Sequence, residues 1–210
     1  MKDLTEEKIL LYASERFFKG DLKITMERVA KELSISKKTL YKYFKNKDDL
    51  FNGVADMYKK DIQDKFESTF KNREDSFAAM CEVFTYLAFK IGLTINNYFI
   101  DEVRKVYPRL WKDFLDFRSK QINKYFPVVI KSGVENGYIR KDVNVEIAFS
   151  MFFASVNNIV TPDFLAVKYF SASDAIKEIL TIFFYGITTP QGKRKFNKHF
   201  KNIFEVTNEK

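Results

Sequence analysis

Apolar residues recur at helical spacing along most of the chain. Between Glu6 and Lys19, for example, Ile9, Ala13 and Phe17 stand at positions i, i+4 and i+8 and would line one face of a helix. The chain holds only 7 Gly and 4 Pro, and no alternating run of apolar and polar residues is bounded by turn residues. The pattern predicts an all-α fold.

Three short helices are predicted at the amino-terminal end. The first ends at Gly20, and the second begins after Thr25, whose hydroxyl can cap it. A three-residue turn follows, and its last residue, Ser36, can cap a third helix that buries Leu40 and Phe44. Two short helices joined by such a turn have the sequence form of a helix-turn-helix.

Six longer helices are predicted over residues 47–69, 75–90, 96–106, 110–133, 145–160 and 172–187. The last two are apolar around much of their circumference, so more than one side of each must be covered. A four-helix interface with two helices from each protomer of a homodimer would cover them; the alternative is that both are central helices of a monomer. We predict a DNA-binding domain over residues 1–47 and a larger helical domain for dimerisation and effector binding over residues 48–210.

The net charge of +8 comes from two short segments. Residues 36–47 and residues 193–204 each carry five Lys or Arg side chains and no acid, so the rest of the chain is acidic on balance. Such local basicity fits contact with a polyanion. For the carboxy-terminal segment, which lacks patterned aromatic residues, we favour a solvated face.

The predicted third helix has the chemistry of a DNA-recognition helix. With Leu40 and Phe44 facing inward, its outward residues are Lys37, Lys38, Thr39, Tyr41, Lys42 and Tyr43. Lysines in the first turn of a helix oppose its dipole, but they become useful once phosphates and guanine edges lie nearby. We therefore expect this surface to contact double-stranded DNA.

These residues resemble a known family. The order of Ile9, Ala13, Phe17, Gly20 and Thr25, followed by TLYKYFKNKDDL from Thr39, is similar to the amino-terminal domain of TetR-family transcriptional regulators over roughly residues 5–51. The resemblance implies a homodimer that binds a palindromic operator, most often as a repressor that a small-molecule effector releases.

The resemblance also implies roles for single residues. Thr25 would cap the second helix beside a phosphate, Lys38 to Lys42 would lie over the major groove, Tyr43 would meet the DNA backbone, and Lys47 would contact a phosphate. Two residues depart from the family pattern. Ser34 stands where the family usually has Gly, so it would adopt a left-handed conformation at some cost. Lys38 replaces a residue that is often small.

Other classes of function find less support in the sequence. His199 is the only histidine, and no Gly-rich phosphate loop is present, so we predict no catalytic residue, cofactor or metal site. The lone Cys81 is expected to be a small buried hydrophobe. The amino-terminal MKDLTEEKIL carries acids where a secretory signal carries bases, and a cytoplasmic location is expected.

Two further expectations concern ligands. We predict a largely apolar effector site among the helices of residues 75–130, with Tyr98 and Trp111 among its walls. The alternative to DNA binding is a basic amphipathic protein on the surface of anionic membranes, with anchors in the carboxy-terminal segment at Phe196, Phe200, Ile203 and Phe204.

Overall fold

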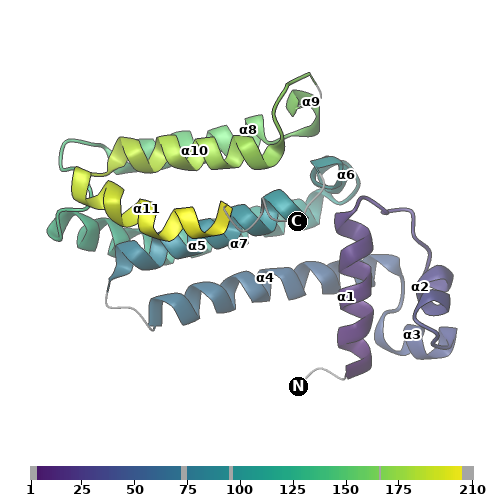
Figure 1. Ribbon diagram of the computed structural model, residues 1–210. Helices are drawn as coiled ribbons and strands as arrows, with labels where there is room; N and C mark the ends of the chain where they lie inside the picture. Colours follow the sequence, from purple (N-terminus) through teal and green to yellow (C-terminus); the bar gives the residue numbers. More distant parts are fainter. Residues whose placement is uncertain (1–3, 72–74, 95–96, 166, 205–210) are drawn as a thin grey trace. The chain divides into compact units, whose positions relative to one another are not determined.

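The computed structural model describes residues 4–71, 75–94, 97–165 and 167–204 (Figure 1). Within these residues the chain is helical, apart from an isolated β-bridge between Ile139 and Thr188. The predicted all-α fold is confirmed. The chain divides into two compact units, one formed by residues 1–62 with 94–115 and the other by residues 63–93 with 116–210.

The first unit contains the three predicted short helices, α1 (Leu4–Phe18), α2 (Met26–Glu32) and α3 (Lys37–Tyr43), together with the start of α4 (Lys47–Lys71) and all of α6 (Asn97–Val106). Its core includes the residues that the helical spacing selected, namely Ile9, Ala13, Phe17, Leu40 and Phe44. The helix α6 and the part of α4 up to residue 62 belong to the same compact unit as the amino-terminal helices. The division into a DNA-binding domain over residues 1–47 and a larger effector-binding and dimerisation domain over residues 48–210 stays a prediction.

Local backbone chemistry explains where these helices begin and end. Gly20 has a φ of 88° and Ser34 has a φ of 53°, both in the left-handed region. At Ser34 this conformation costs about 1–2 kcal/mol because the Cβ atom crowds the following carbonyl oxygen. The left-handed conformation that was expected for Ser34 is thus confirmed.

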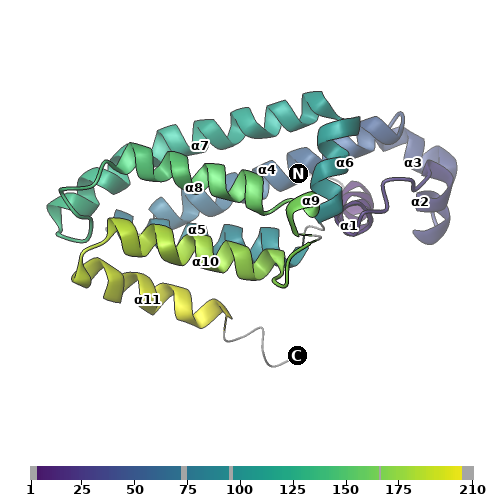
Figure 2. The ribbon, with the colours of Figure 1, turned by 90° about the horizontal axis from the view of Figure 1, so that it is seen from above.

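The second unit is built from α5 (Ser76–Thr94), the later part of α7 (Pro108–Glu135), α8 (Val145–Ile159), α10 (Ala172–Ile187) and α11 (Pro190–Phe204). α8 and α10 run side by side (Figure 2). Between them and α5 lies a core of aromatic rings in mutual contact, among them Phe84, Phe149, Phe152 and Phe183. Cys81 is buried in the same core, as expected.

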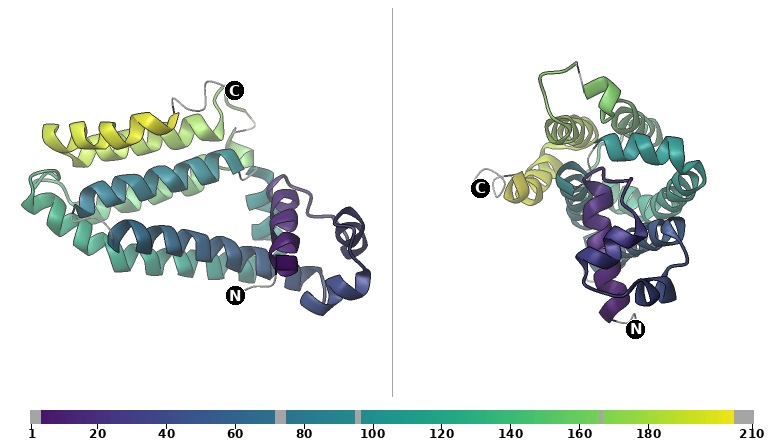
Figure 3. Two further views of the ribbon diagram at one scale, coloured as in Figure 1. Left: turned by 60° about the horizontal axis from the view of Figure 1, so that its bottom comes forward. Right: turned by 90° about the vertical axis from the view of Figure 1, so that its right-hand side faces the viewer.

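Two helices were not predicted: the single turn α9 (Pro162–Leu165) and the carboxy-terminal α11. α11 lies along α10 (Figure 3), and the Phe196 ring stacks on the Phe184 ring with 4.3 Å between their centres. The close approach of α11 requires Gly192, because a Cβ atom there would lie 2.1 Å from the carbonyl oxygen of Tyr138.

The position of α11 corrects the interpretation of the carboxy-terminal segment as a membrane anchor. Phe196 is only 1% exposed, so it belongs to the protein core and is not free to enter a bilayer. The side chains of Phe200, Ile203 and Phe204 lie outside the described part. None of the described helices is long and apolar enough to cross a membrane.

Candidate DNA-binding site

The outward face of α3 is basic and open. Leu40 and Phe44 are buried in the core of the first unit, which turns Lys37, Lys38 and Lys42 toward solvent. Tyr41 is also exposed, whereas Thr39 and Tyr43 are partly buried. Of the predicted contact residues of α3, the three lysines and Tyr41 are thus exposed, while Tyr43 packs against the core of the first unit.

The beginning of α3 is fixed by Ser36. The Ser36 Oγ atom accepts a hydrogen bond from the backbone N–H of Thr39 at 3.0 Å, and the two hydroxyl groups lie 2.8 Å apart. This cap satisfies one of the donors that the first turn of a helix leaves without a partner. Thr25 caps α2 in the same manner, with its Oγ1 atom accepting from the N–H of Arg28 at 3.2 Å.

The lysines of α3 differ in their partners. The Lys37 Nζ atom lies 3.4 Å from Glu27 Oε1 in an exposed ion pair. The Lys42 ammonium lies 5.5 Å from the centre of the Tyr43 ring. Neither Lys38 nor Lys42 forms an ion pair with any acidic side chain that the structure describes. These two lysines are the charges of α3 that are most available to a polyanion.

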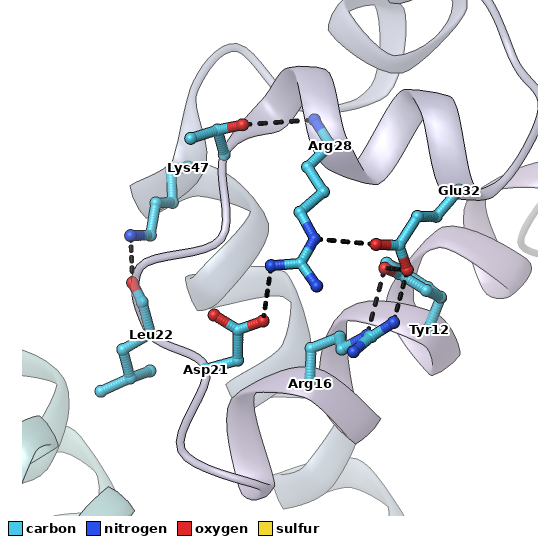
Figure 4. Close-up of polar contacts among 8 residues, drawn as sticks. Tyr12, Arg16, Asp21, Leu22, Arg28, Glu32 and Lys47 are labelled. Atoms are coloured by element: carbon cyan, nitrogen blue, oxygen red, sulfur yellow. Dashed lines mark hydrogen bonds and ion pairs between the residues drawn. The ribbon is translucent and has the colours of Figure 1, made fainter.

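Lys47 takes a position that the sequence did not predict. Its side chain, at the start of α4, is partly buried and donates a hydrogen bond to the carbonyl oxygen of Leu22, in the segment before α2 (Figure 4). Lys47 thus connects α4 to the entrance of the helix-turn-helix. An ammonium group has three donors, so this bond leaves others for a phosphate.

A polar network that was missed from the sequence joins α1 to α2 (Figure 4). Glu32 accepts hydrogen bonds from Tyr12 and Arg16 of α1 and from Arg28 of α2, at 2.8 Å from Arg28 Nε to Glu32 Oε1. Arg28 also lies 3.3 Å from Asp21. The pairs Tyr12–Arg16 and Arg28–Glu32 each have a spacing of four, which signals one helix face. The contact across helices carried no local signal.

The charge of Glu32 is stabilised by this network. Hydrogen bonds from Tyr12 and then from Arg28 and Arg16 lower the pKa of Glu32 to about 2. Arg16 and Arg28 are therefore matched by acids, whereas Lys38 and Lys42 are not.

The two predicted effector residues are placed unequally. The side chain of Tyr98 lies outside the described part, although its backbone belongs to α6. Trp111 is partly buried, packs against the core of the first unit, and lies 6.0 Å from the Phe114 ring, centre to centre. Among the described residues no group of His, Cys, Asp and Glu side chains could hold a metal ion.

Comparisons with known proteins agree with this geometry. Residues 10–54 match the family described as bacterial regulatory proteins, tetR family. The chain is 23% identical over 169 residues to the uncharacterized HTH-type transcriptional regulator YvaF of Bacillus subtilis (strain 168). The alignment covers 80% of this chain and 87% of that protein.

Solved structures share the whole fold. A TetR-family transcriptional regulator from Marinobacter aquaeolei VT8 is 22% identical, with a TM-score of 0.65 over 97% of this chain and 99% of that one. The ketosteroid transcriptional regulator KstR2 of Mycobacterium tuberculosis is 16% identical, with a TM-score of 0.61 over 90% and 97%. The matched residues 10–54 form the helix-turn-helix and the start of α4, so the candidate DNA-binding site lies in the part of the chain that is similar to the tetR family of bacterial regulatory proteins.

Proposed function

We propose that the protein represses transcription by binding a palindromic or near-palindromic operator as a homodimer, and that a small-molecule effector releases it. The observation that carries the DNA part of the proposal is the face of α3, where Lys38 and Lys42 are exposed without acidic partners while Leu40 and Phe44 are buried. A two-fold dimer would present two such helices to major grooves roughly 34–36 Å apart.

The proposed contacts divide into two kinds. Thr25, Tyr43 and Lys47 contact phosphates and set the position of the protein on the duplex. Lys37, Lys38, Thr39, Tyr41 and Lys42 lie over the groove, and Ser36 holds the start of α3. Lys47→Ala is then expected to weaken binding to every DNA sequence and to lower the salt slope by about one, whereas Lys38→Ala changes the base preference. Equal loss on all sequences for both variants would contradict this division.

The proposed dimer interface is formed by α8 and α10. Ile147 and Met151 stand one turn apart on α8 and are 58% and 66% exposed, and Ile182 of α10 is 64% exposed. Large apolar side chains gathered on neighbouring helices mark a surface that another protein covers. Sedimentation of the purified protein tests this interface, because a monomer at micromolar concentration would remove it.

The proposed effector is small and apolar or amphipathic. It would bind more tightly to a conformation in which the two recognition helices no longer match the operator, and a difference of a few kcal/mol in its affinity for the two states is sufficient. Tyr98 and Trp111 remain proposed contacts for it. If alanine at either position leaves the response to the effector intact, that residue is not part of the site.

The experiment that tests the proposed operator most directly is selection of bound fragments from random duplex DNA. We expect the enriched fragments to share two half-sites related by a two-fold axis, with centres about one helical turn apart. Enrichment of a single half-site would contradict the dimeric mode. Failure of any duplex to compete for the protein at low salt would overturn the proposal as a whole.

A further inference from the structure

An arginine in the second unit lacks the anion that its burial calls for. Arg118, on α7, is half-buried, and its Nη1 atom donates to the Asn157 Oδ1 atom at 3.0 Å. Its guanidinium lies 5.1 Å from the centre of the Phe153 ring. Burial lowers the pKa of Arg118, and none of the described acidic side chains forms an ion pair with it. Buried cations in proteins are normally paired with an anion.

The site lies where α7 and α8 run antiparallel (Figure 2). Two contacts define the pairing of these helices: Arg118 with Asn157 near one end, and Phe126 with Phe149, whose ring centres are 3.8 Å apart, two turns further along. Phe149 and Phe153 continue into the aromatic core of the unit. The guanidinium therefore stands at the end of a row of apolar side chains.

A second polar group nearby also lacks a partner. The Gln121 Oε1 atom is buried from water and has no hydrogen-bond partner in the structure. Gln121 follows Arg118 by three residues, so both side chains lie on the same face of α7. A buried acceptor without a donor costs about 1–3 kcal/mol. Rotation of the Gln121 side-chain amide exchanges this oxygen for the NH2 group, which can donate to a ligand oxygen beside the Arg118 guanidinium.

The chemistry of the two groups restricts the ligand. A guanidinium presents a planar fork of donors that matches the two oxygens of a carboxylate. The aromatic row beside it favours a long apolar body. Exposed lysines, such as those of α3, attract anions in general, but they offer neither desolvation nor an apolar surface.

We infer that the effector is an amphipathic organic acid of the fatty-acid type, whose carboxylate pairs with Arg118 while its apolar chain lies along the aromatic side chains of α7 and α8. This inference rests on the proposed regulation by an effector. The alternative role of Arg118 is structural: its side chain would cover the Phe153 ring, and its guanidinium would donate a hydrogen bond to Asn157. The two roles differ in whether the charge of a ligand matters.

The test uses the full-length protein and two probes of equal chain length, decanoate and decan-1-ol, at pH 7.5. Titration calorimetry measures the binding of each probe, and fluorescence anisotropy measures release of a labelled operator fragment. We expect wild-type protein to bind decanoate at least tenfold more tightly than decan-1-ol, as a charge-assisted bidentate pair implies. Arg118→Met should abolish that preference while still binding the alcohol.

The matched control is Lys120→Met, which removes one positive charge from an exposed position of the same helix. It should keep the wild-type preference for decanoate. Unchanged operator affinity without ligand, for both variants, shows that the fold is intact. If Arg118→Met binds decanoate as tightly as wild type, or if wild type binds neither probe, the inference is overturned.

The two readouts separate this inference from regulation by an effector. Equal binding of both probes, with release of the operator, would overturn the role of Arg118 and leave regulation by an apolar effector standing. Binding of decanoate that depends on Arg118 but does not release the operator would support the site and contradict its regulatory role.

Discussion

Helices α3 and α11 come from the two segments with the same charge, yet the structure uses them in opposite ways. Each segment carries five bases and no acid. On α3 the apolar residues that point inward leave Lys38 and Lys42 in solvent without acidic partners. On α11 the ring of Phe196 is buried, and two bases, Lys193 and Lys195, contact other parts of the protein.

The partners of the α11 bases are specific. Lys195 forms an ion pair with Asp75 at the start of α5 and donates to the Tyr138 hydroxyl at 2.8 Å. Lys193 lies 3.7 Å from the centre of the Tyr185 ring. Burial and the nearby Lys198 lower the pKa of Lys195. A run of bases therefore identifies a polyanion contact only when the rest of the protein leaves those bases unmatched.

The largest expected effect tests the packing of α11. Phe196→Ala removes a ring from the core, and the free energy of unfolding should fall by about 3–5 kcal/mol. Urea denaturation measures the loss. Tyr169→Ala, at a fully exposed aromatic residue of the same unit, should stay within about 0.5 kcal/mol of wild type. Comparable losses in the two variants would mean that α11 does not pack as described.

The comparison of charges is tested by DNA affinity. The double variant Lys38→Ala, Lys42→Ala should bind its operator about 10–100-fold more weakly, because it removes two cations that lie over the major groove in the proposed complex. The matched variant Arg194→Ala, Lys198→Ala removes the same charge from exposed positions of α11. Its affinity should be within about twofold of wild type, measured by anisotropy at several salt concentrations. An equal loss of DNA affinity in the two double variants would contradict the proposal that α3 contacts DNA and α11 does not.

A smaller effect is expected at the turn that leads into α3. Ser34→Gly relieves the left-handed strain of about 1–2 kcal/mol, offset by the entropy cost of glycine of about 0.5–1 kcal/mol. The net gain in stability should be about 0.5 kcal/mol in urea. Ser150→Gly, inside α8, should instead destabilise the protein by up to about 1 kcal/mol. Destabilisation by both would show that Ser34 is not strained.

The smallest effect concerns the matched charges between α1 and α2. The folded-state pKa of Glu32 lies below its ordinary value, so its stabilising contribution is complete above about pH 4.5 and disappears as the pH falls to about 2. The difference in stability between wild type and Glu32→Gln should vanish over the same range. Glu135→Gln, which removes an exposed carboxylate of α7, is the control for the loss of one negative charge. A pH-independent difference for Glu32→Gln would exclude ionisation as its cause.

Much of the first unit was predictable because its signals are local. The caps at Thr25 and Ser36, the spacing of Leu40 and Phe44, and the left-handed Ser34 all involve residues within a few positions of one another. In the second unit the predicted limits of α10, residues 172 and 187, match the structure. Its capping box between Ser171 and Asp174 again requires only neighbours.

The remaining features depend on contacts between distant residues. Lys47 reaches the carbonyl oxygen of Leu22, Lys195 reaches Asp75, and Arg118 reaches Asn157, and no local pattern links the members of these pairs. The helix α11 was missed because its basic residues suggested a solvated tail. The one residue of that segment shown to be buried, Phe196, gave too weak a pattern to indicate packing. The DNA contacts proposed for Lys47 and for the side chains of α3 stay predictions.

Helix α11 packs closely against Tyr138, and only a glycine at position 192 allows this contact. The contact limits how the protein can be shortened. A truncation before Pro190 would uncover the rings of α10, and the product would aggregate instead of serving as a minimal regulator. Purification tags and fluorescent fusions at the carboxy terminus should therefore follow Phe204, leaving this last helix whole.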